Sequence, residues 1–289
     1  MSDLHSLLKS LGGPPQTPAL LASVVATQGS SYRKRGARLL ILEDGSCHGL
    51  LSGGCLEQAV VERAAAVFVD GRWLRFQLDT RPFSGCDGSL DITVERVGSL
   101  LHDCWPILRQ RAGGYYLNTR AGLTWLERQP DPAAWLSLPL LPLPRLLVVG
   151  GGPDSQALVA LGQAVEWEVE WLCHPEHRHP VVGARAVAPC LLPEQCRPDD
   201  RSGAILVNHQ LGRDAAYARW LWNTPLAYLG CVGSRARGEE ILNSLWREGL
   251  EPERRPLYCP AGLRLGGEGP AAVALSVVAQ MQEIFEAHA

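Results

Sequence analysis

The sequence has none of the gross features of a nucleic-acid-binding or membrane protein. Its 289 residues contain 27 Lys and Arg against 30 Asp and Glu, so the formal net charge is only −3. A nucleic-acid-binding domain usually has a clear excess of positive charge. No run of about 18 apolar residues is available for a transmembrane helix. We therefore expect neither nucleic acid nor a membrane as a partner.

The common metal-binding and catalytic motifs are also missing. Nine cysteines are present, but no two form a C-x-x-C pair, so zinc-ribbon and redox-dithiol motifs lack their spacing. The sequence has no H-E-x-x-H, no Walker loop and no recognisable Ser-His-Asp order. The first residues lack the charged and then apolar pattern of an export signal. Together with free thiols, this predicts a cytoplasmic protein.

What is present indicates two α/β domains. Residues 1–128 predict a mixed α/β domain, with a helix near 4–11, strands near 19–27, 37–42 and 47–51, a helix over 56–68, and strands near 73–78 and 90–97. Five prolines between residues 129 and 144 predict a linker. In residues 145–289 strands alternate with helices, which predicts a Rossmann-like, doubly wound parallel sheet.

A basic loop in the first domain suggests an anion site. Gly29 and Gly36 bound a segment rich in hydroxyl and cationic side chains, which can wrap a phosphate. The candidate ligands are Ser30, Ser31, Arg33, Lys34, Arg35 and Arg38.

Two cysteines follow in glycine-rich surroundings. Cys55 comes after Gly53 and Gly54, where the predicted helix over 56–68 begins. A thiol at a helix N-terminus feels the positive end of the helix dipole, which favours the thiolate. Cys86 lies in the glycine-rich loop of residues 80–88. We expect both thiols to be functional, whereas the other seven cysteines receive no role.

The second domain has its own candidate ligand sites. Gly150 and Gly152 lie in a turn between a strand and a helix, where dinucleotide-binding proteins hold pyrophosphate. However, the next strand ends in Cys173 and His174, where an acidic residue would bind the ribose. Gly233, Ser234 and Arg235 follow a later strand, and such residues suit an anion at the carboxyl end of a parallel sheet.

Taken in order, these segments resemble the XdhC/CoxI family of molybdenum-hydroxylase maturation factors, also described as xanthine dehydrogenase accessory proteins. The resemblance covers about residues 18–285. It is carried by the basic loop, by Ser52-Gly53-Gly54-Cys55-Leu56-Glu57, by Gly85-Cys86-Asp87-Gly88, and by the segments that begin at Gly150, Asn208, Gly233 and Pro260. The departures from the family pattern, such as Cys173-His174 in place of an aspartate pair, fall largely on nucleotide recognition.

The resemblance implies a function and a set of roles. Family members bind the molybdenum cofactor, as molybdopterin or its cytosine dinucleotide form, and protect it during sulfuration by a cysteine desulfurase. They deliver it into an apo molybdoenzyme of the xanthine dehydrogenase or aldehyde oxidase type, without turnover chemistry of their own being required. In this chain the basic loop would meet the phosphates, and Cys55 or Cys86 would approach the thiophilic molybdenum. Gly53, Gly54 and Glu57 belong to the matching motif, and the resemblance also implies a homodimer.

Two other functions remain open from the residues. A Rossmann-like half could belong to an NAD(P)- or FAD-dependent oxidoreductase, although the missing acid argues against these cofactors. Cys55 and Cys86 could instead form a thiol-based redox or metal sensor.

Overall fold

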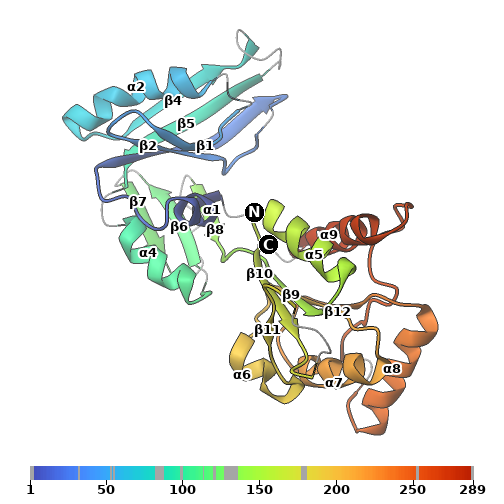
Figure 1. The fold of residues 1–289 in the computed structure, drawn as a ribbon. Helices are drawn as coiled ribbons and strands as arrows, with labels where there is room; N and C mark the ends of the chain where they lie inside the picture. Colours follow the sequence, from blue (N-terminus) through green and yellow to red (C-terminus); the bar gives the residue numbers. More distant parts are fainter. Residues whose placement is uncertain are drawn as a thin grey trace. The chain divides into compact units, whose positions relative to one another are not determined.

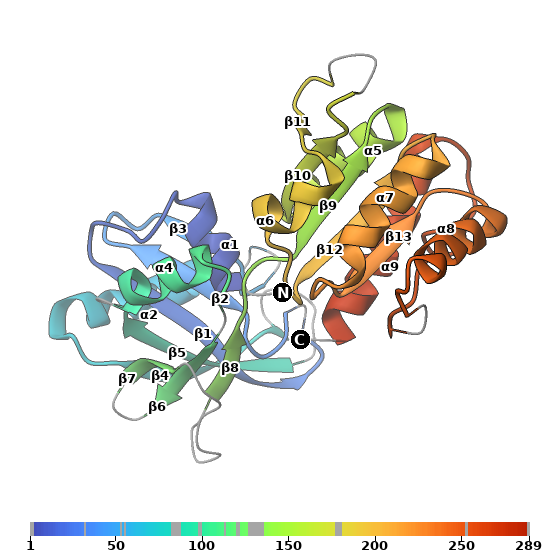
Figure 2. The same ribbon diagram turned by 90° about the horizontal axis from the view of Figure 1, so that it is seen from below.

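The computed structural model describes residues 3–31, 33–52, 54, 56–81, 88–97, 100–112, 114–119, 122–126, 136–176, 181–251 and 254–287. The chain forms two compact units, Met1–Pro142 and Leu143–Ala289, which Figures 1 and 2 show from two directions. Each unit has its own sheet and its own core.

The first unit is built on a five-stranded antiparallel sheet with the order β3-β2-β1-β5-β4. Its strands are β1 (Ala19–Gly29), β2 (Arg38–Leu42), β3 (Cys47–Gly49), β4 (Leu74–Asp79) and β5 (Gly88–Arg96). The two long strands β1 and β5 pair at the centre. The pairing of β1 with β2 ends at Ser23 and Arg38, so the last residues of β1 pair only with β5.

Helix α2 (Glu57–Asp70) covers one face of this sheet (Figure 1). Val60, Ala64 and Val67 recur at helical spacing and are buried against the sheet. The helix ends at Gly71, whose left-handed φ of 71° lets its N–H bond the carbonyl of Val67.

The other face is covered by α1 (Asp3–Ser10) and α4 (Leu100–Arg109). A small antiparallel sheet with the order β7-β6-β8 completes the unit, and α4 contacts it. Its strands are β6 (Gly114–Thr119), β7 (Gly122–Leu126) and β8 (Leu136–Leu140). Strand β8 lies within the segment that its prolines predicted to be linker. As the edge strand of this sheet, β8 can accommodate Pro139 because it pairs on one side only.

The second unit has a parallel five-stranded sheet with the order β11-β10-β9-β12-β13. This is the doubly wound order that the alternating pattern predicted. The strands are β9 (Arg145–Gly150), β10 (Glu168–Cys173), β11 (Arg185–Ala186), β12 (Ser202–Val207) and β13 (Tyr228–Cys231). The strand order reverses between β9 and β12, so ligands would be expected at the carboxyl ends of these two strands.

Helices cover both faces of the parallel sheet. One face packs against α6 (Leu192–Cys196), which follows the 3₁₀ turn η1 (Pro189–Leu191), and against α7 (Leu211–Trp222) and α8 (Arg235–Arg247). The other packs against α5 (Pro153–Ala164) and α9 (Pro270–Ala287), which lie side by side in both views. Among the described residues, no helix is both long and apolar enough to cross a bilayer.

Candidate functional site

Three loops that the sequence singled out leave the first sheet at the same edge. In an antiparallel sheet, the end of one strand lies beside the start of its neighbour. Here β1 ends at Gly29 beside the start of β5, and β4 ends nearby at Asp79. On the other side of β1, β3 ends at Gly49 beside the start of β2, which pairs with β1 six residues before Gly29. We call this end of the sheet the convergent edge. The basic loop, the segment after β3 and the residues after Asp79 all follow strand ends on this side of the sheet.

The loop before α2 is held by the carboxylate of Glu57. One carboxylate oxygen accepts the backbone N–H groups of Leu51 (2.9 Å) and Ser52 (2.8 Å). The other accepts the Ser52 hydroxyl (2.7 Å) and the N–H of Leu56 (3.1 Å). The Ser52 oxygen in turn accepts the N–H groups of Gly54 and Leu56, both at 3.2 Å. We call this arrangement the Glu57 clamp, and it joins Leu51 and Ser52 to the first turn of α2.

The clamp keeps Glu57 ionised. Partial burial raises the pKa of this carboxyl, but the hydrogen bonds from Ser52 and Leu51 outweigh it and hold the pKa below its usual range. Glu57 lies in the first turn of α2, where a negative charge is favourable. Its hydrogen bonds therefore join the segment of Leu51 and Ser52 to the start of α2.

The basic loop presents cations to solvent. Lys34 and Arg35 are exposed and Arg33 is half-buried. The Ser31 hydroxyl donates to the carbonyl of Arg33 at 2.6 Å. The N–H of Ala37 donates to Lys34, and that of Gly36 to Val24 on β1, so the end of the loop is tied to the sheet. Ser30 is exposed at the start of the loop.

Arg38 is placed differently from the other cations of the predicted cradle. It is the first residue of β2 and only 2 % exposed. It lies on the same strand face as Leu40, which packs under α1 and α4, and its charge is felt by the Cys104 thiol of α4. Helices cover both faces of this sheet, so Arg38 is buried although the sequence predicted it as a phosphate ligand of the basic loop. Arg38 is thus part of the interior and does not join Lys34 and Arg35.

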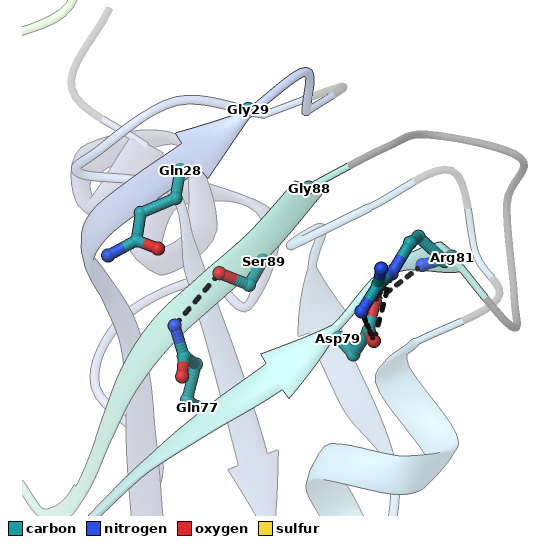
Figure 3. A pocket seen from close by; sticks show the side chains of 7 residues that line it. All are labelled: Gln28, Gly29, Gln77, Asp79, Arg81, Gly88 and Ser89. Atoms are coloured by element: carbon teal, nitrogen blue, oxygen red, sulfur yellow. Dashed lines mark hydrogen bonds and ion pairs between the residues drawn. The ribbon is translucent and has the colours of Figure 1, made fainter.

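An open hollow of about 450 Å³ lies at the convergent edge, within the size range of small-molecule sites (Figure 3). Its lining is polar and comes from the ends of β1, β4 and β5: Gln28, Gly29, Gln77, Asp79, Arg81, Gly88 and Ser89. The amide of Gln77 donates to the Ser89 hydroxyl at 2.9 Å, and Arg81 pairs with Asp79 at 2.7 Å. These partners lie side by side on the strand ends.

Strand pairing explains how these side chains come together. Leu78 and Leu90 pack under α2, so their strand neighbours Gln77 and Ser89 lie on the opposite face. A bulge between Val24 and Ala26 shifts the alternation in β1, which brings Gln28 level with Ser89 on that face. The sequence analysis missed these hollow residues. Their signal was the alternating Gln77, Asp79 and Arg81 leading into a glycine-rich loop.

A close backbone approach defines the inner wall of the hollow. Gly88 pairs with Gly29, and a Cβ at Gly88 would lie 2.5 Å from the carbonyl oxygens of both Gln28 and Ser30. Only glycine fits there without moving the strand. Thr80 adds two hydrogen bonds to the Gly88 carbonyl, through its N–H and its hydroxyl. Gly29, where the basic loop starts, and Gly88, which follows the loop of Cys86, are therefore fixed to each other.

Gly53, Cys55 and Cys86 lie outside the described residues, so their predicted roles stay predictions. Gly54 adopts a φ of 104°, a backbone conformation that favours glycine. In the part of the chain that the structure describes, no three His, Cys, Asp or Glu side chains form a metal-binding group.

In the second unit, Gly150 and Gly152 lie where the strand order reverses. A Cβ at Gly150 would collide with the carbonyl of Val207 on β12, and Gly150 has a φ of 145°. Gly152 precedes α5 with a φ of 104°. The turn therefore has the close backbone packing of a dinucleotide-binding turn. At the end of β10, however, the ribose position is occupied by the buried Cys173.

A buried ion pair organises the neighbouring strand ends. Asp214 is fully buried and pairs with Arg237 at 2.5 Å. Its other oxygen accepts the side-chain amide of Asn208, and Arg237 donates to the Asn208 carbonyl at 2.6 Å. Ser234 caps α8 by accepting the N–H of Arg237, whereas Arg235 is exposed and Gly233 lies tightly against Arg237. The sequence analysis predicted Arg235 as an anion ligand, whereas Arg237, two residues later, contacts the buried Asp214.

Both units match models of known protein families. Residues 15–77 match the XdhC and CoxI family, and residues 146–281 match the XdhC Rossmann domain. The chain belongs to the XdhC/CoxI family.

Two proteins of similar sequence align with nearly the whole chain. It is 27% identical to a probable xanthine dehydrogenase subunit of Bacillus subtilis, with 97% of each chain covered. It is 24% identical to the molybdenum cofactor insertion chaperone PaoD of Escherichia coli, over 92% of this chain and 83% of PaoD. The crystal structure of a Bacillus halodurans protein described as a xanthine dehydrogenase matches all of this chain and 97% of that one with a TM-score of 0.80, at 24% identity.

The solved structure supports the fold of this XdhC/CoxI chain, with its α/β first unit and Rossmann-like second unit. Within the family match, residues 15–77 include the basic loop and the Glu57 clamp. Residues 146–281 include the glycine turn and the Asp214–Arg237 pair.

Proposed function

We propose that this protein binds the molybdenum cofactor and inserts it into an apo molybdoenzyme of the xanthine dehydrogenase or aldehyde oxidase type. The observation that carries the proposal is that the basic loop, the Glu57 clamp and the residues after Asp79 all follow strand ends on the same side of the first sheet. Membership of the XdhC/CoxI family and the likeness to a molybdenum cofactor insertion chaperone support it. The cofactor is cargo here, because it leaves with the client enzyme.

The chemistry of the convergent edge suits an anionic pterin. Lys34 and Arg35 are exposed on the basic loop, and the hollow of about 450 Å³ at the end of β1 has a polar lining. Charge-assisted hydrogen bonds from such side chains to phosphate are short and strong. The Gln28 and Gln77 amides supply both donors and acceptors, which a pterin ring requires. The residues present therefore fit the cargo in charge and in polarity.

Cys55 and Cys86 would supply the soft ligands for molybdenum. In the sequence, Cys55 precedes Leu56, which bonds the Glu57 clamp, and Cys86 lies two residues before Gly88, which pairs with Gly29 at the convergent edge. Loops positioned by a rigid scaffold commonly hold binding residues. The Glu57 clamp would keep the Cys55 loop in one shape while cargo enters and leaves.

The proposal is tested by the cargo that the protein carries. Wild type, Lys34→Ala/Arg35→Ala, Cys55→Ala and Arg72→Ala would be purified without oxygen from molybdate-fed cells. Molybdenum would be measured by mass spectrometry and pterin by fluorescence after oxidation. Arg72 is the matched control, an exposed arginine beyond the far end of α2 and roughly 20 Å from its N-terminus.

We expect the double variant and Cys55→Ala each to lose most of the bound molybdenum and pterin, while Arg72→Ala keeps the wild-type content. Unchanged cargo in the first two variants would contradict the site. Cargo lost equally in all the variants would contradict the location of the site at the convergent edge.

The proposal extends to the sulfuration of the cofactor, the oligomeric state of the protein and its location in the cell. We infer that a cysteine desulfurase sulfurates the cofactor while it is held, that the protein acts as a homodimer, and that it works in the cytoplasm. Cofactor-loaded protein should activate an apo client in a purified assay, and sulfide-dependent activity should need the desulfurase in the mixture. Failure of loaded protein to activate any apo hydroxylase of the organism would contradict the insertion role.

A further inference from the structure

Cys231 and Cys259 of the second unit lie next to each other although they are 28 positions apart in the sequence. Gly230 pairs in parallel with Tyr258, so the next residues along, Cys231 and Cys259, are neighbours across the pair. The N–H of Cys231 donates to the Tyr258 carbonyl at 2.9 Å, and the N–H of Ala261 to the Cys231 carbonyl at 3.1 Å. Paired strands lie about 4.8 Å apart, which falls within the Cα separation of disulfides.

The Cys259 thiol is partly exposed and lies against the first turn of α8. Gly238 makes this approach possible, since a Cβ there would lie 2.6 Å from the Cβ of Cys259. The hydrogen bond from Cys231, the Arg237 guanidinium and the N–H of Gly238 lower the pKa of Cys259, against the opposing effects of partial burial and the Asp214 charge. The neutral thiol donates to the Ser234 carbonyl at 3.2 Å.

Cys231 has the opposite character. It is fully buried, and its sulfur lies 3.6 Å from a carboxylate oxygen of Asp214. Its hydrogen bond with Cys259, burial and the Asp214 charge all raise its pKa, so it stays a protonated thiol. The pair thus combines an accessible, ionisable sulfur with a protected thiol beside it. Reactive and resolving cysteines in peroxide-sensitive proteins are arranged in this manner.

We propose that Cys259 and Cys231 form an oxidisable thiol pair, in which Cys259 reacts with hydrogen peroxide and Cys231 resolves the product as a disulfide. This site is separate from the convergent edge and does not depend on the proposed cofactor function.

Oxidation of Cys259 and formation of the disulfide are two steps that each conserve atoms and electrons. The Cys259 thiolate attacks one oxygen of hydrogen peroxide, the O–O bond breaks, and sulfenic acid and hydroxide form. Cys231 then gives its thiol proton to the sulfenic oxygen as its sulfur attacks the Cys259 sulfur, so the S–S bond forms, the S–O bond breaks and water leaves. Two electrons pass from the two thiols to the peroxide. A dithiol reductant reverses the change by thiol–disulfide exchange.

Peptide mapping of the full-length protein tests the pair. Reduced protein would be treated with one to several equivalents of hydrogen peroxide, alkylated and digested with trypsin. Cleavage places Cys231 alone in residues 220–235 and Cys259 alone in residues 255–264. We expect these two peptides to become linked, and the link to disappear after dithiothreitol.

Exposed Cys47 is the control thiol, because partial burial and the charges of Glu57 and Asp44 raise its pKa. At pH 7, iodoacetamide should modify Cys259 faster than Cys47 by about tenfold or more. In Cys231→Ser the sulfenic acid of Cys259 should accumulate and be trapped by dimedone, whereas Cys259→Ser should leave Cys231 unmodified by peroxide.

Absence of the linked peptides with excess peroxide, or equal reactivity of Cys259 and Cys47, would overturn the proposal. If Cys231→Ser does not fold, the wild-type mapping and the alkylation rates decide the question by themselves. The proposed cofactor function is tested by molybdenum content and can fail or succeed independently of either result.

Discussion

The carboxylate of Glu57 accepts a 2.7 Å hydrogen bond from the Ser52 hydroxyl, across the loop that contains Cys55. The contact joins the first turn of α2 to the segment after β3, five residues earlier. Since the same carboxylate also binds three backbone N–H groups, this one side chain holds Leu51, Ser52 and Leu56 together.

Glu57→Gln should open this loop. The substitution removes the charge from four hydrogen bonds, and hydrogen bonds to charged groups contribute about 1.5–3 kcal/mol each. We expect the amides of Leu51, Ser52 and Leu56 to exchange with solvent at least tenfold faster, as measured by hydrogen exchange. The matched control is Glu62→Gln, an exposed position of the same helix, which should leave these rates unchanged.

The clamp should weaken in acid. The pKa of Glu57 is lower in the folded protein than its ordinary value of 4.5, so its contribution is complete above about pH 4.5. It is lost as the pH falls through the lower folded pKa. The difference in urea stability between wild type and Glu57→Gln should therefore be constant from pH 7 to 5.5 and shrink towards pH 3.5. A difference that grows on acidification would show that the carboxyl is not held ionised.

Gly88→Ala should separate the ends of β1 and β5. The new Cβ would lie 2.5 Å from two backbone oxygens, so the strands must shift, at a cost of about 1–3 kcal/mol in unfolding free energy. The control is Gly212→Ala at the start of α7, where a Cβ meets nothing within 4 Å. Calorimetry should show a lower Tm for the first variant and an equal or slightly higher Tm for the second.

Arg237→Met should destabilise the second unit by about 3–5 kcal/mol, because it leaves the carboxylate of Asp214 buried and uncompensated. Arg235→Met, two residues earlier on the same helix and exposed, should change the urea midpoint little. The Arg237 variant should also alkylate more slowly at Cys259, since a positive charge that lowers that pKa is gone. Equal stability of the two variants would contradict the importance of the buried pair.

Much of the fold could be predicted because it depends on local patterns. The apolar spacing of Val60, Ala64 and Val67 predicted α2, and the alternation of strands with helices after residue 145 predicted the parallel sheet. The sequence analysis did not predict α4, which has Pro106 inside it, or β8, an edge strand that contains Pro139. Packing in α4 and strand pairing in β8 outweighed the local effect of proline.

For the candidate site, the sequence by itself determined which residue types lie in which loops, and these motifs were sufficient to indicate the family. Only the tertiary structure decided that three of those segments follow strand ends on one side of the sheet, that Arg38 is buried, that Glu57 binds Ser52, and that Cys231 lies beside Cys259. The physical reason is strand register. A motif is a property of consecutive residues, whereas the pairing of distant strands determines which side chains share a face and which of them water can reach.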